Sequence, residues 1–327
     1  MNRTALHIGP HPVVGRALLA PMAGLTDQPF RNLCRRFGAA TATSEMTTSD
    51  TRLWNSNKSA TRLDLRKENG LRIVQIAGSE PEMMAEAGRA AHKLGADIID
   101  INMGCPAKKV CRKLAGSALL QDESLVARIL EQTVQAVPVP VTLKMRTGWN
   151  PENRNGVRIA QLAERIGIQA IAVHGRTRAC MYKGDAEYET IRQIKSAVSI
   201  PVFANGDITT PETALEVLRK TGADGVMIGR GALGQPWFFS ELAAKLNEKD
   251  SAEPLTTATQ RDIILDHLDG LYSLYGEYRG LRVARKHLTW YCRYLEDAES
   301  YREQVVRVES VSEQLRLTRK FFDRYHN

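Results

Sequence analysis

The first 246 residues alternate between short β-branched runs and amphipathic stretches, and this alternation constrains the fold more than any other feature. The runs with strand character lie at residues 16–20, 42–46, 73–77, 97–102, 141–145, 170–174, 202–205 and 225–228. The main helical stretches between them lie at residues 29–37, 81–94, 123–136, 157–166, 188–198 and 211–220. Eight strands joined in this way by helices predict an α/β protein with a (β/α)8 architecture, the TIM barrel.

An open doubly wound sheet is the alternative arrangement of the same elements. Such sheets often carry a Gly-x-Gly-x-x-Gly loop after the first strand, and this chain has none there. Polar residues also follow nearly every strand, as in barrels, whose active sites collect at the carboxyl ends of the strands. Both observations favour the barrel.

The ends of the helices carry capping signals. Ser79 precedes Glu80-Pro81, and Thr209 and Thr210 precede Pro211-Glu212. These residues are expected to act as N-terminal caps. A glycine follows four of the helices, as expected for a left-handed residue just past a helix end: Gly38, Gly95, Gly167 and Gly222. These signals support the predicted helix boundaries.

Composition changes at residues 247–259, a polar stretch that contains proline. Beyond it, apolar residues recur at helical spacing and strand signals are nearly absent up to Tyr325. We therefore expect three parts: a barrel over residues 1–246 that carries the chemistry, a linker over 247–259, and a small helical bundle over 260–327.

The chain carries 45 Lys and Arg against 37 Asp and Glu, a net charge of +8, which favours an anionic partner. The C-terminal residues 251–327 contain 12 of each sign, so the whole excess lies before them. This neutral tail still holds one basic cluster, formed by Arg279, Arg282, Arg285, Lys286 and His287. The cluster is either a solvated helix face or a surface that contacts the anion.

Cysteine usage and hydropathy exclude several classes of protein. Five irregularly spaced cysteines argue against a disulfide framework and for a reducing compartment, so we expect a cytoplasmic protein. No apolar run reaches the length of a membrane span, and the N-terminus lacks the pattern of an export signal. Without Cys-x-x-Cys or His-Glu-x-x-His we expect no metal. We also expect a monomer.

A cysteine lies in a tight turn where the fourth strand must end, since residues 102–106 read Asn-Met-Gly-Cys-Pro. Glycine permits unusual backbone angles and proline stops the strand, so Cys105 is placed for chemistry rather than for packing. Four cations follow within a few residues: Lys108, Lys109, Arg112 and Lys113. The pairing predicts a reactive thiol that works on a polyanion, with the cations expected to lower the pKa of the thiol.

Three other strands carry polar residues among apolar neighbours. Gln75 needs hydrogen-bond partners once buried, and either a bound ring or a neighbouring strand would supply them. Lys144 lies between apolar residues and so requires a counter-charge or an electron-rich ligand. His174 ends the sixth strand, and we expect it to share one pocket with Arg176 and Arg178, although a structural histidine is the alternative.

The loops after the last two strands have the composition of a phosphate site. Asn205, Gly206 and Asp207 lie at the end of the seventh strand, and Gly229 and Arg230 follow the eighth. In (β/α)8 barrels these two loops commonly bind phosphate, here through glycine amides and an arginine. A mononucleotide flavin on a barrel needs no dinucleotide-binding loop, so we expect a phosphate-bearing cofactor of this kind.

Taken together, these motifs resemble the tRNA-dihydrouridine synthase family, and most closely its bacterial B-type branch. The resemblance covers nearly the whole chain and includes residues 20–24, 74–78, 100–106, 144–149, 173–177, 204–207 and 227–230. It implies reduction of the C5=C6 bond of a D-loop uridine in tRNA to dihydrouridine, with FMN as cofactor and NADPH as reductant. Hydride would pass from reduced FMN to C6, and Cys105 would protonate C5.

The resemblance also implies roles for individual residues. Pro21, Met22 and Ala23 would line the FMN ring, whose edge would be hydrogen-bonded by Gln75 and Lys144. The ribityl phosphate would be held by His174, Asn205, Gly206, Asp207, Gly229 and Arg230. The target uracil would contact Asn102 and Arg146. Phosphates of tRNA would contact Lys108, Lys109, Arg112, Lys113, Arg176 and Arg178, together with Arg282, Arg285 and Lys286 in the tail.

Two other functions stay open. A flavin-dependent barrel of the dihydroorotate dehydrogenase type would reduce a free pyrimidine. Such an enzyme would need neither the basic loop at residues 108–113 nor the helical tail. An RNA-binding barrel without catalysis would not need Cys105 and Lys144. Cys111 departs from the closest members of the family, which usually have asparagine there. This second thiol is either silent, as we expect, or able to form a disulfide that would make the site sensitive to oxidation.

Overall fold

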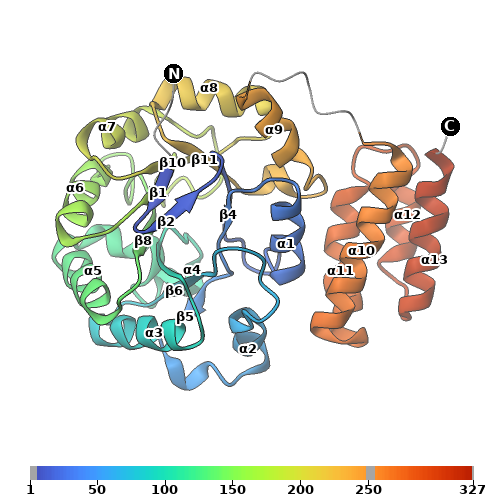
Figure 1. Cartoon of the computed structure of the whole chain (residues 1–327), viewed down its shortest axis with the longest axis horizontal. Helices are drawn as coiled ribbons and strands as arrows, with labels where there is room; N and C mark the ends of the chain where they lie inside the picture. The colour runs from blue at the N-terminus through green and yellow to red at the C-terminus, as the bar shows by residue number, and fades with distance from the viewer. Residues whose placement is uncertain (1–5, 248–254, 326–327) are drawn as a thin grey trace.

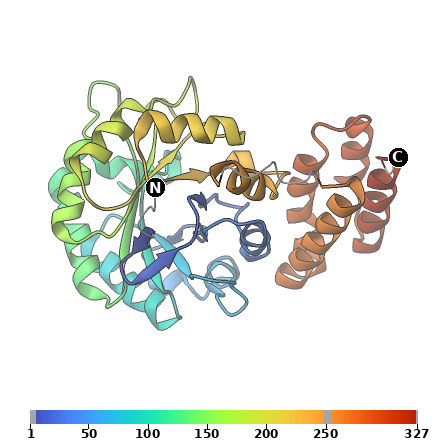
Figure 2. The ribbon, with the colours of Figure 1, turned by 45° about the horizontal axis from the view of Figure 1, so that its top comes forward.

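The computed structural model describes residues 6–247 and 255–325. Its main sheet has nine parallel strands in the order β4-β3-β11-β10-β9-β8-β7-β6-β5. They are β3 (Ala17–Leu19), β4 (Thr41–Ala42), β5 (Thr47–Thr48), β6 (Ile73–Ala77), β7 (Ile98–Met103), β8 (Val141–Arg146), β9 (Ile171–His174), β10 (Val202–Asn205) and β11 (Gly225–Ile228). The two end strands, β4 and β5, are pieces of one segment that also bridges to β6 at Thr43 and Ile73. The sheet therefore closes into the predicted (β/α)8 barrel (Figures 1 and 2).

An N-terminal hairpin, which the sequence analysis did not predict, packs against one end of the barrel. It consists of β1 (Leu6–Ile8) and β2 (His11–Val13), paired antiparallel. Ile8 and Val13 are buried in one cluster with Leu18 and Phe203 from the barrel strands. Strands of three residues are too short to show an alternating pattern, so the sequence carries no usable signal for them.

Helices follow the strands and cover the outside of the barrel (Figure 1). They are α1 (Gln28–Arg36), α2 (Asn57–Leu63), α3 (Pro81–Lys93), α4 (Lys108–Cys111), α5 (Glu123–Ala136), α6 (Gly156–Ile166), α7 (Glu189–Ala197), α8 (Pro211–Thr221) and α9 (Phe238–Leu246). Short 3-10 turns lie at Thr51–Leu53, Gly116–Gln121 and Arg230–Ala232. Each helical stretch predicted from the sequence is confirmed to within one residue at either end.

The capping signals were mostly correct. Thr210 caps α8, because its hydroxyl accepts from the amide of Thr213 at 3.2 Å in a capping box. The four expected glycines, Gly38, Gly95, Gly167 and Gly222, all have positive φ. The prediction for Ser79 was wrong: Glu80 takes the cap position without a side-chain capping bond, and the Ser79 hydroxyl donates to the carbonyl of Lys113 at 3.0 Å.

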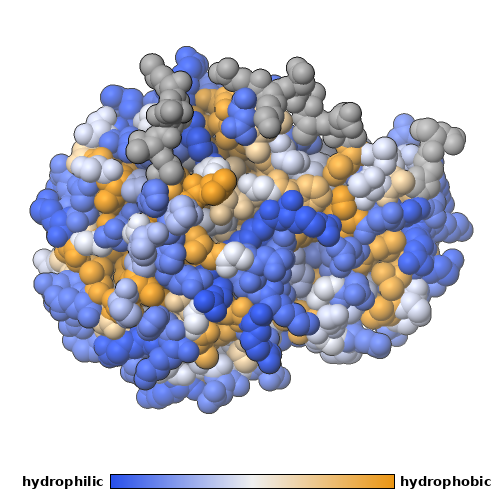
Figure 3. Space-filling view, viewed as in Figure 1, coloured by the Kyte–Doolittle hydropathy of each residue, from blue (hydrophilic) through white to orange (hydrophobic). Residues whose placement is uncertain are grey.

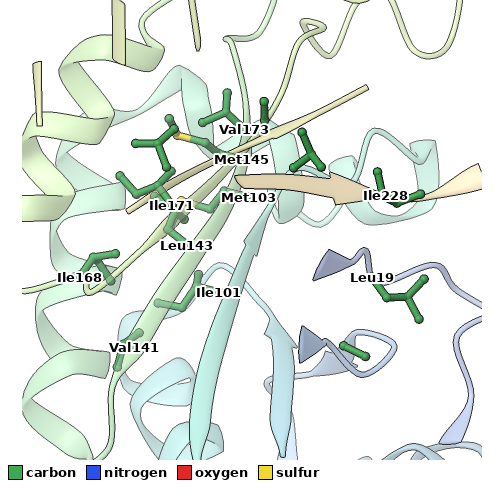
Figure 4. Packing of buried hydrophobic residues seen from close by; sticks show 14 of the residues in the cluster. Leu19, Ile101, Met103, Val141, Leu143, Met145, Ile168, Ile171, Val173 and Ile228 are labelled. Carbon is green, nitrogen blue, oxygen red and sulfur yellow. The ribbon is translucent and has the colours of Figure 1, made fainter. Parts of the chain in front are cut away.

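The barrel strands point alternate side chains outward to the helices and inward to the barrel. Leu143 and Met145 of β8 belong to the large core between strands and helices that Figure 4 shows. A separate apolar cluster fills the barrel near the starts of the strands and includes Leu18, Ile73, Ile98, Ala172, Phe203 and Met227. Further along several of these strands the inward positions are polar, and they form the candidate site.

The C-terminal region is helical, as predicted. It contains α10 (Thr257–Tyr275), α11 (Glu277–Tyr291), α12 (Ala298–Val305), α13 (Val311–Phe322) and a 3-10 turn at Asp323–Tyr325, around a core of its own. It lies beside α1 of the barrel, where Arg36 and Asp266 pair at 2.7 Å (Figures 1 and 2). Helix α10 begins inside the expected linker, of which residues 248–254 lie outside the described residues.

No helix in the described part of the chain is long and apolar enough to cross a membrane. On the face shown in Figure 3, hydrophilic residues surround apolar patches over both the barrel and the C-terminal helices. All five cysteines are free in this structure.

Candidate active site at the barrel mouth

Polar side chains gather inside the barrel at the carboxyl ends of its strands. They come from β6 (Gln75), β7 (Asp100 and Asn102), β8 (Thr142, Lys144 and Arg146), β9 (His174) and β10 (Asn205). Strand alternation explains the placement, because each of these residues is two or four positions from another inward residue of its own strand. All but His174 are less than a tenth exposed, so every polar atom among them needs a partner.

One hydrogen-bonded chain crosses the floor of this site. Thr142 Oγ1 donates to Asp100 Oδ1 at 2.6 Å, and Gln75 Nε2 donates to Asp100 Oδ2 at 2.7 Å. Asn102 Nδ2 in turn donates to Gln75 Oε1 at 2.7 Å. Gln75 is thus partnered by a neighbouring strand, the second of the two possibilities that its position left open, and its side chain is held in one orientation.

The same chain positions the turn that carries the cysteine. Asn102 Oδ1 accepts from the amides of Gly104 and Cys105 at 3.2 and 3.0 Å. The Cys105 carbonyl accepts from the Ser117 hydroxyl at 2.9 Å. Both ends of the turn are therefore fixed, and the thiol occupies a defined place beside the polar floor.

Sequence analysis missed Asp100 and Thr142. Asp100 did carry a signal, because an aspartate at an inward position of an apolar strand is as costly as the lysine at position 144. Burial raises the pKa of Asp100 to about 6, although hydrogen bonds from Thr142 and Gln75 and the charge of Lys144 lower it. Asp100 is therefore mostly ionised at neutral pH and supplies a negative charge opposite Lys144.

The Cys105 thiol is half-buried, and its pKa is raised. Burial is the largest cause, and the Ala107 amide and the charges of Arg146 and Lys144 oppose it only in part. The expectation that nearby cations lower the pKa of this thiol was therefore wrong, because desolvation outweighs them. Cys105 is predominantly a protonated thiol at neutral pH.

Cys111 lies close to the same turn and is buried. Its Sγ is 3.6 Å from the Cys105 carbonyl oxygen and 3.7 Å from the Ser117 hydroxyl. The second thiol thus packs under the backbone of the first, which is consistent with a silent role.

Lys144 is buried between apolar strand neighbours, as its sequence context indicated. Its Nζ donates to Asn205 Oδ1 at 3.1 Å, and Asn205 Nδ2 donates to the Met227 carbonyl at 2.7 Å. Burial, and then the charge of Arg146, lower the pKa of Lys144 to about 8. An ammonium group has three donors, so Lys144 still has donor capacity for a ligand above the floor.

The loops after β10 and β11 form an anion cradle. Gly206 has φ +124°, and a Cβ there would lie 2.8 Å from that of Ala186, so only glycine fits without a shift. Asp207 lies on the loop after β10, and Gly229 lies on the loop after β11. In the described ranges, no hydrogen bond to another residue is donated by the backbone amides of Gly206, Asp207, Gly229 and Arg230. These free amides beside the Arg230 guanidinium fit a phosphate group, which supports the predicted site for a mononucleotide.

Arg176 shares a pocket with His174, as expected, since its Nη1 lies 3.3 Å from His174 Nε2, but it is buried there. The residue is only 4% exposed, and its guanidinium binds the Asp207 carboxylate through Nη1 and Nη2 at 2.8 and 2.5 Å. Burial raises the pKa of Asp207, but the hydrogen bonds from Arg176 and the Ala186 amide lower it below its usual value. The expected contact between Arg176 and tRNA phosphates does not fit this geometry, because the arginine is committed to holding the cradle.

His174 and Arg146 meet under a tyrosine that the sequence analysis missed. The Tyr182 ring lies 5.3 Å from the Arg146 guanidinium, 5.2 Å from that of Arg230 and 6.2 Å from the His174 ring. Burial and the surrounding cations, Lys144 first, lower the pKa of His174 to about 2, so its ring is neutral. Tyr182 is half exposed and lies in an irregular loop, where no periodic pattern marks a residue as functional.

Arg146 is anchored by backbone carbonyls. It donates to Gly104 at 2.9 Å, to Thr177 at 2.9 Å and to Met181 at 2.8 Å. It therefore ties the cysteine turn to the loop after β9. The loop after β3 holds Pro21, Met22 and Ala23 and lies on the opposite side of the barrel mouth from β8. A hydrogen bond from the Met22 amide to Thr26 Oγ1 at 2.8 Å fixes this loop.

Exposed cations surround the mouth. Lys108, Lys109, Arg112 and Lys113 on and after α4 are all exposed, and Arg178 lies over the Trp149 ring at 4.6 Å. From α11, Lys286 reaches within 3.4 Å of the position that a Cβ of Gly24 would take. Arg282 is also exposed, whereas Arg285 is half-buried and donates to the Val308 carbonyl. His287 is buried and therefore does not belong to the exposed basic cluster.

Comparisons with known proteins agree with this arrangement. The family model for dihydrouridine synthase (Dus) matches residues 18–326. tRNA-dihydrouridine synthase B of Shewanella oneidensis is 55% identical over 318 residues, which are 97% of this chain and 98% of that protein. The protein of the same name from Pseudomonas aeruginosa is 55% identical over 324 residues, which are 99% of this chain and 98% of that protein. The one from Vibrio cholerae is 52% identical over 318 residues, which are 97% of this chain and 99% of that protein.

One solved structure is similar in fold. Histamine dehydrogenase from Rhizobium sp. 4-9 superimposes with a TM-score of 0.54 at 12% identity, over 81% of this chain and 50% of that one. This chain thus spans about half of that protein, and the likeness concerns the barrel fold alone. The family match and the close relatives carry the assignment: this chain is an enzyme of the dihydrouridine synthase family.

Proposed function

We propose that this chain reduces the C5=C6 bond of a D-loop uridine in tRNA to 5,6-dihydrouridine, with FMN as cofactor and NADPH as reductant. The observation that carries the proposal is the meeting of three features at one barrel mouth. These are the protonated thiol of Cys105, the buried ammonium group of Lys144, and the anion cradle after β10 and β11. Family membership and the names of the close relatives support the same reaction.

FMN would lie between the cradle and the cysteine turn. Its phosphate would be bound by the free amides of Gly206, Asp207, Gly229 and Arg230. Neutral His174 and Asn205 lie nearby. Lys144 would hydrogen-bond the ring edge together with Gln75, while Pro21, Met22 and Ala23 would line the ring. When bound and reduced by NADPH, FMN supplies the hydride that C6 of the uracil receives.

Cys105 is suited to donate the accompanying proton to C5. Because burial raises the pKa of its thiol, nearly all molecules carry the proton at neutral pH. Asn102 holds the turn through two amides, so the thiol does not need to reorganise before it reacts. Asn102 and Arg146, next to Cys105, would also contact the uracil and fix which carbon faces the thiol.

The cations around the mouth would bind the tRNA backbone. Those on the α4 side and those on α11 flank the site, so an RNA that bridged them would pass over the thiol. The target base must leave the stack to reach the polar floor, at a cost of roughly a few kcal/mol, and phosphate contacts would offset that cost.

A flavin enzyme that acts on a free pyrimidine is the competing function. It would share the cofactor, the thiol and the reduced bond. The exposed cations Lys108, Lys109, Arg112, Lys113, Arg282 and Lys286 favour tRNA, because a small molecule held inside the barrel would not touch them.

The test is anaerobic single-turnover reoxidation of the NADPH-reduced protein. The reduced enzyme is mixed with unmodified tRNA, or with free uridine, uracil or orotate, and flavin absorbance and dihydrouridine are followed. We expect rapid reoxidation by tRNA alone, with dihydrouridine in the RNA. Reoxidation by a free pyrimidine would assign the chain to the competing class, and a protein that binds no FMN would refute the cradle.

A further inference from the structure

Three potential metal ligands meet where the barrel packs against the C-terminal helices. Asp27 caps α1, His267 belongs to α10 and His287 belongs to α11. One ligand atom of each lies within 4.8 Å of the other two, and none of the three residues is more than 3% exposed. No local motif links positions 27, 267 and 287, which is why sequence spacing indicated no metal.

Two nitrogens of this cluster lack a partner. Nε2 of His267 and Nε2 of His287 are buried and form no hydrogen bond within the described structure. Leaving such a buried polar atom unpaired is unfavourable. Here two of them belong to the same cluster as one carboxylate. A single group that accepts both imidazole lone pairs would remove both penalties.

Other polar atoms of the cluster, on His267 and Asp27, are already oriented by hydrogen bonds. His267 Nδ1 lies 3.0 Å from the Tyr291 hydroxyl. Asp27 Oδ1 accepts from the Phe30 amide at 3.2 Å, and Oδ2 accepts from the Tyr275 hydroxyl at 3.3 Å. Outer hydrogen bonds of this kind fix the tautomer and direction of metal-binding side chains in known sites. They leave both Nε2 atoms and one further lone pair on each carboxylate oxygen for an ion.

We propose that Asp27, His267 and His287 bind one divalent transition-metal ion of the Zn²⁺ class, which joins the barrel to the C-terminal helices. Two imidazoles and a carboxylate are a donor set that such ions accept, with a water molecule in a fourth position. The positive ion would also compensate the charge of the Asp27 carboxylate, which is buried and forms no ion pair with another described residue.

A groove on the surface reaches one member of the cluster, His267. A groove of about 650 Å³ runs between α1 and α10, and Leu33, Asp266 and His267 are among the residues that line it. This groove at the junction between the two regions would bring an ion next to His267. Its binding is independent of the proposed reaction.

The first experiment measures metal in the untagged full-length protein. Cells are grown with added Zn²⁺, the protein is purified in metal-free buffer, and its zinc content is measured by mass spectrometry beside that of three variants. We expect one ion per chain in the unmodified protein and in the control His92→Gln, whose histidine lies on α3 away from the cluster. Asp27→Asn, which keeps the helix cap, and His287→Gln should each lose the ion.

Retention of zinc by folded Asp27→Asn and His287→Gln proteins would overturn the proposal, as would unmodified protein that holds none. If the variants do not fold, X-ray absorption at the zinc edge of the unmodified protein decides. Scattering from two imidazoles is expected. A zinc shell with sulfur ligands, or with oxygen alone, would place the ion elsewhere and refute the site.

Discussion

The two ends of the barrel interior are built from the same strands but have opposite character. Near the strand starts the interior is apolar, with Ile73, Ile98 and Phe203 packed under the N-terminal hairpin. Two residues further along each strand the inward positions become Gln75, Asp100 and Asn205. The apolar end is covered by the protein itself, whereas polar groups at the other end remain available to a ligand.

The difference separates stability from chemistry along a single strand. Burial of apolar side chains near the strand starts stabilises the barrel, and these side chains do not contact the site. The polar layer adds little net stability, because its groups exchange water for one another, but it fixes directions for the ligand. Substitutions two residues apart should therefore have effects of different kinds.

Replacing Cys105 with alanine tests the polar end and should have the largest effect. Product formation in a single turnover should fall by about 10²- to 10⁴-fold, because the proton donor is lost. The midpoint of thermal unfolding and the affinity for FMN should stay nearly unchanged. Cys111→Ala is the matched control and should retain full rate, since its thiol packs under the turn. Unaltered turnover in Cys105→Ala would show that another group is the acid.

Replacing Phe203 with alanine tests the apolar end. We expect a loss of about 3–5 kcal/mol in the free energy of unfolding, because the ring is buried and its removal leaves a cavity. Urea unfolding followed by circular dichroism measures the loss. The single-turnover rate per folded molecule should stay within a factor of about two, since the ring lies in the apolar layer. A large fall in that rate would show that the two layers are coupled.

Removing the cations on and after α4 extends the comparison to the rim above the polar layer. The variant with Lys108, Lys109, Arg112 and Lys113 changed to alanine should bind tRNA more weakly by about ten- to a hundredfold at low salt. The slope of log affinity against log salt concentration should also become shallower. Lys220→Ala, at an exposed ion pair on α8, is the control. Equal salt dependence in the rim variant and the control would exclude this surface from the RNA contact.

The smallest effect concerns pH. Burial lowers the pKa of Lys144 to about 8 in the free protein, so the side chain is charged below that pH and loses its proton above it. If FMN binds the charged form, its Kd should be flat below pH 8 and rise by up to about tenfold per pH unit above it. Flavin fluorescence titrations measure this. Lys144→Met should bind more weakly and without the rise, and a rise that persists in this variant would assign the titration to another group.

Much of the fold could be predicted, because it rests on local patterns. The helices have strong periodicity and glycine ends, and seven barrel strands match their predicted runs closely. The second strand departs from its prediction, since residues 41–48 form two short pieces, β4 and β5, around a single bridge. The N-terminal hairpin is too short to leave a pattern.

The candidate site could be predicted wherever a loop motif follows a strand. The cysteine turn, Lys144 and the two cradle loops all lie at the expected strand ends. Partnerships between loops could not be predicted, because a sequence does not show that Arg176 faces Asp207 or that Tyr182 covers Arg146. The net rise in the pKa of the Cys105 thiol also depends on burial, which neighbouring charges in the sequence do not report.

The ion pair between Arg176 and Asp207 has a consequence for how the cofactor would arrive. Asp207 has φ +49°, an uncommon backbone conformation for a residue other than glycine, and the bidentate arginine together with the Ala186 amide holds it there. The loop is thus preorganised during folding. The loop then loses little conformational entropy on association, so FMN should bind without a rearrangement of the loop.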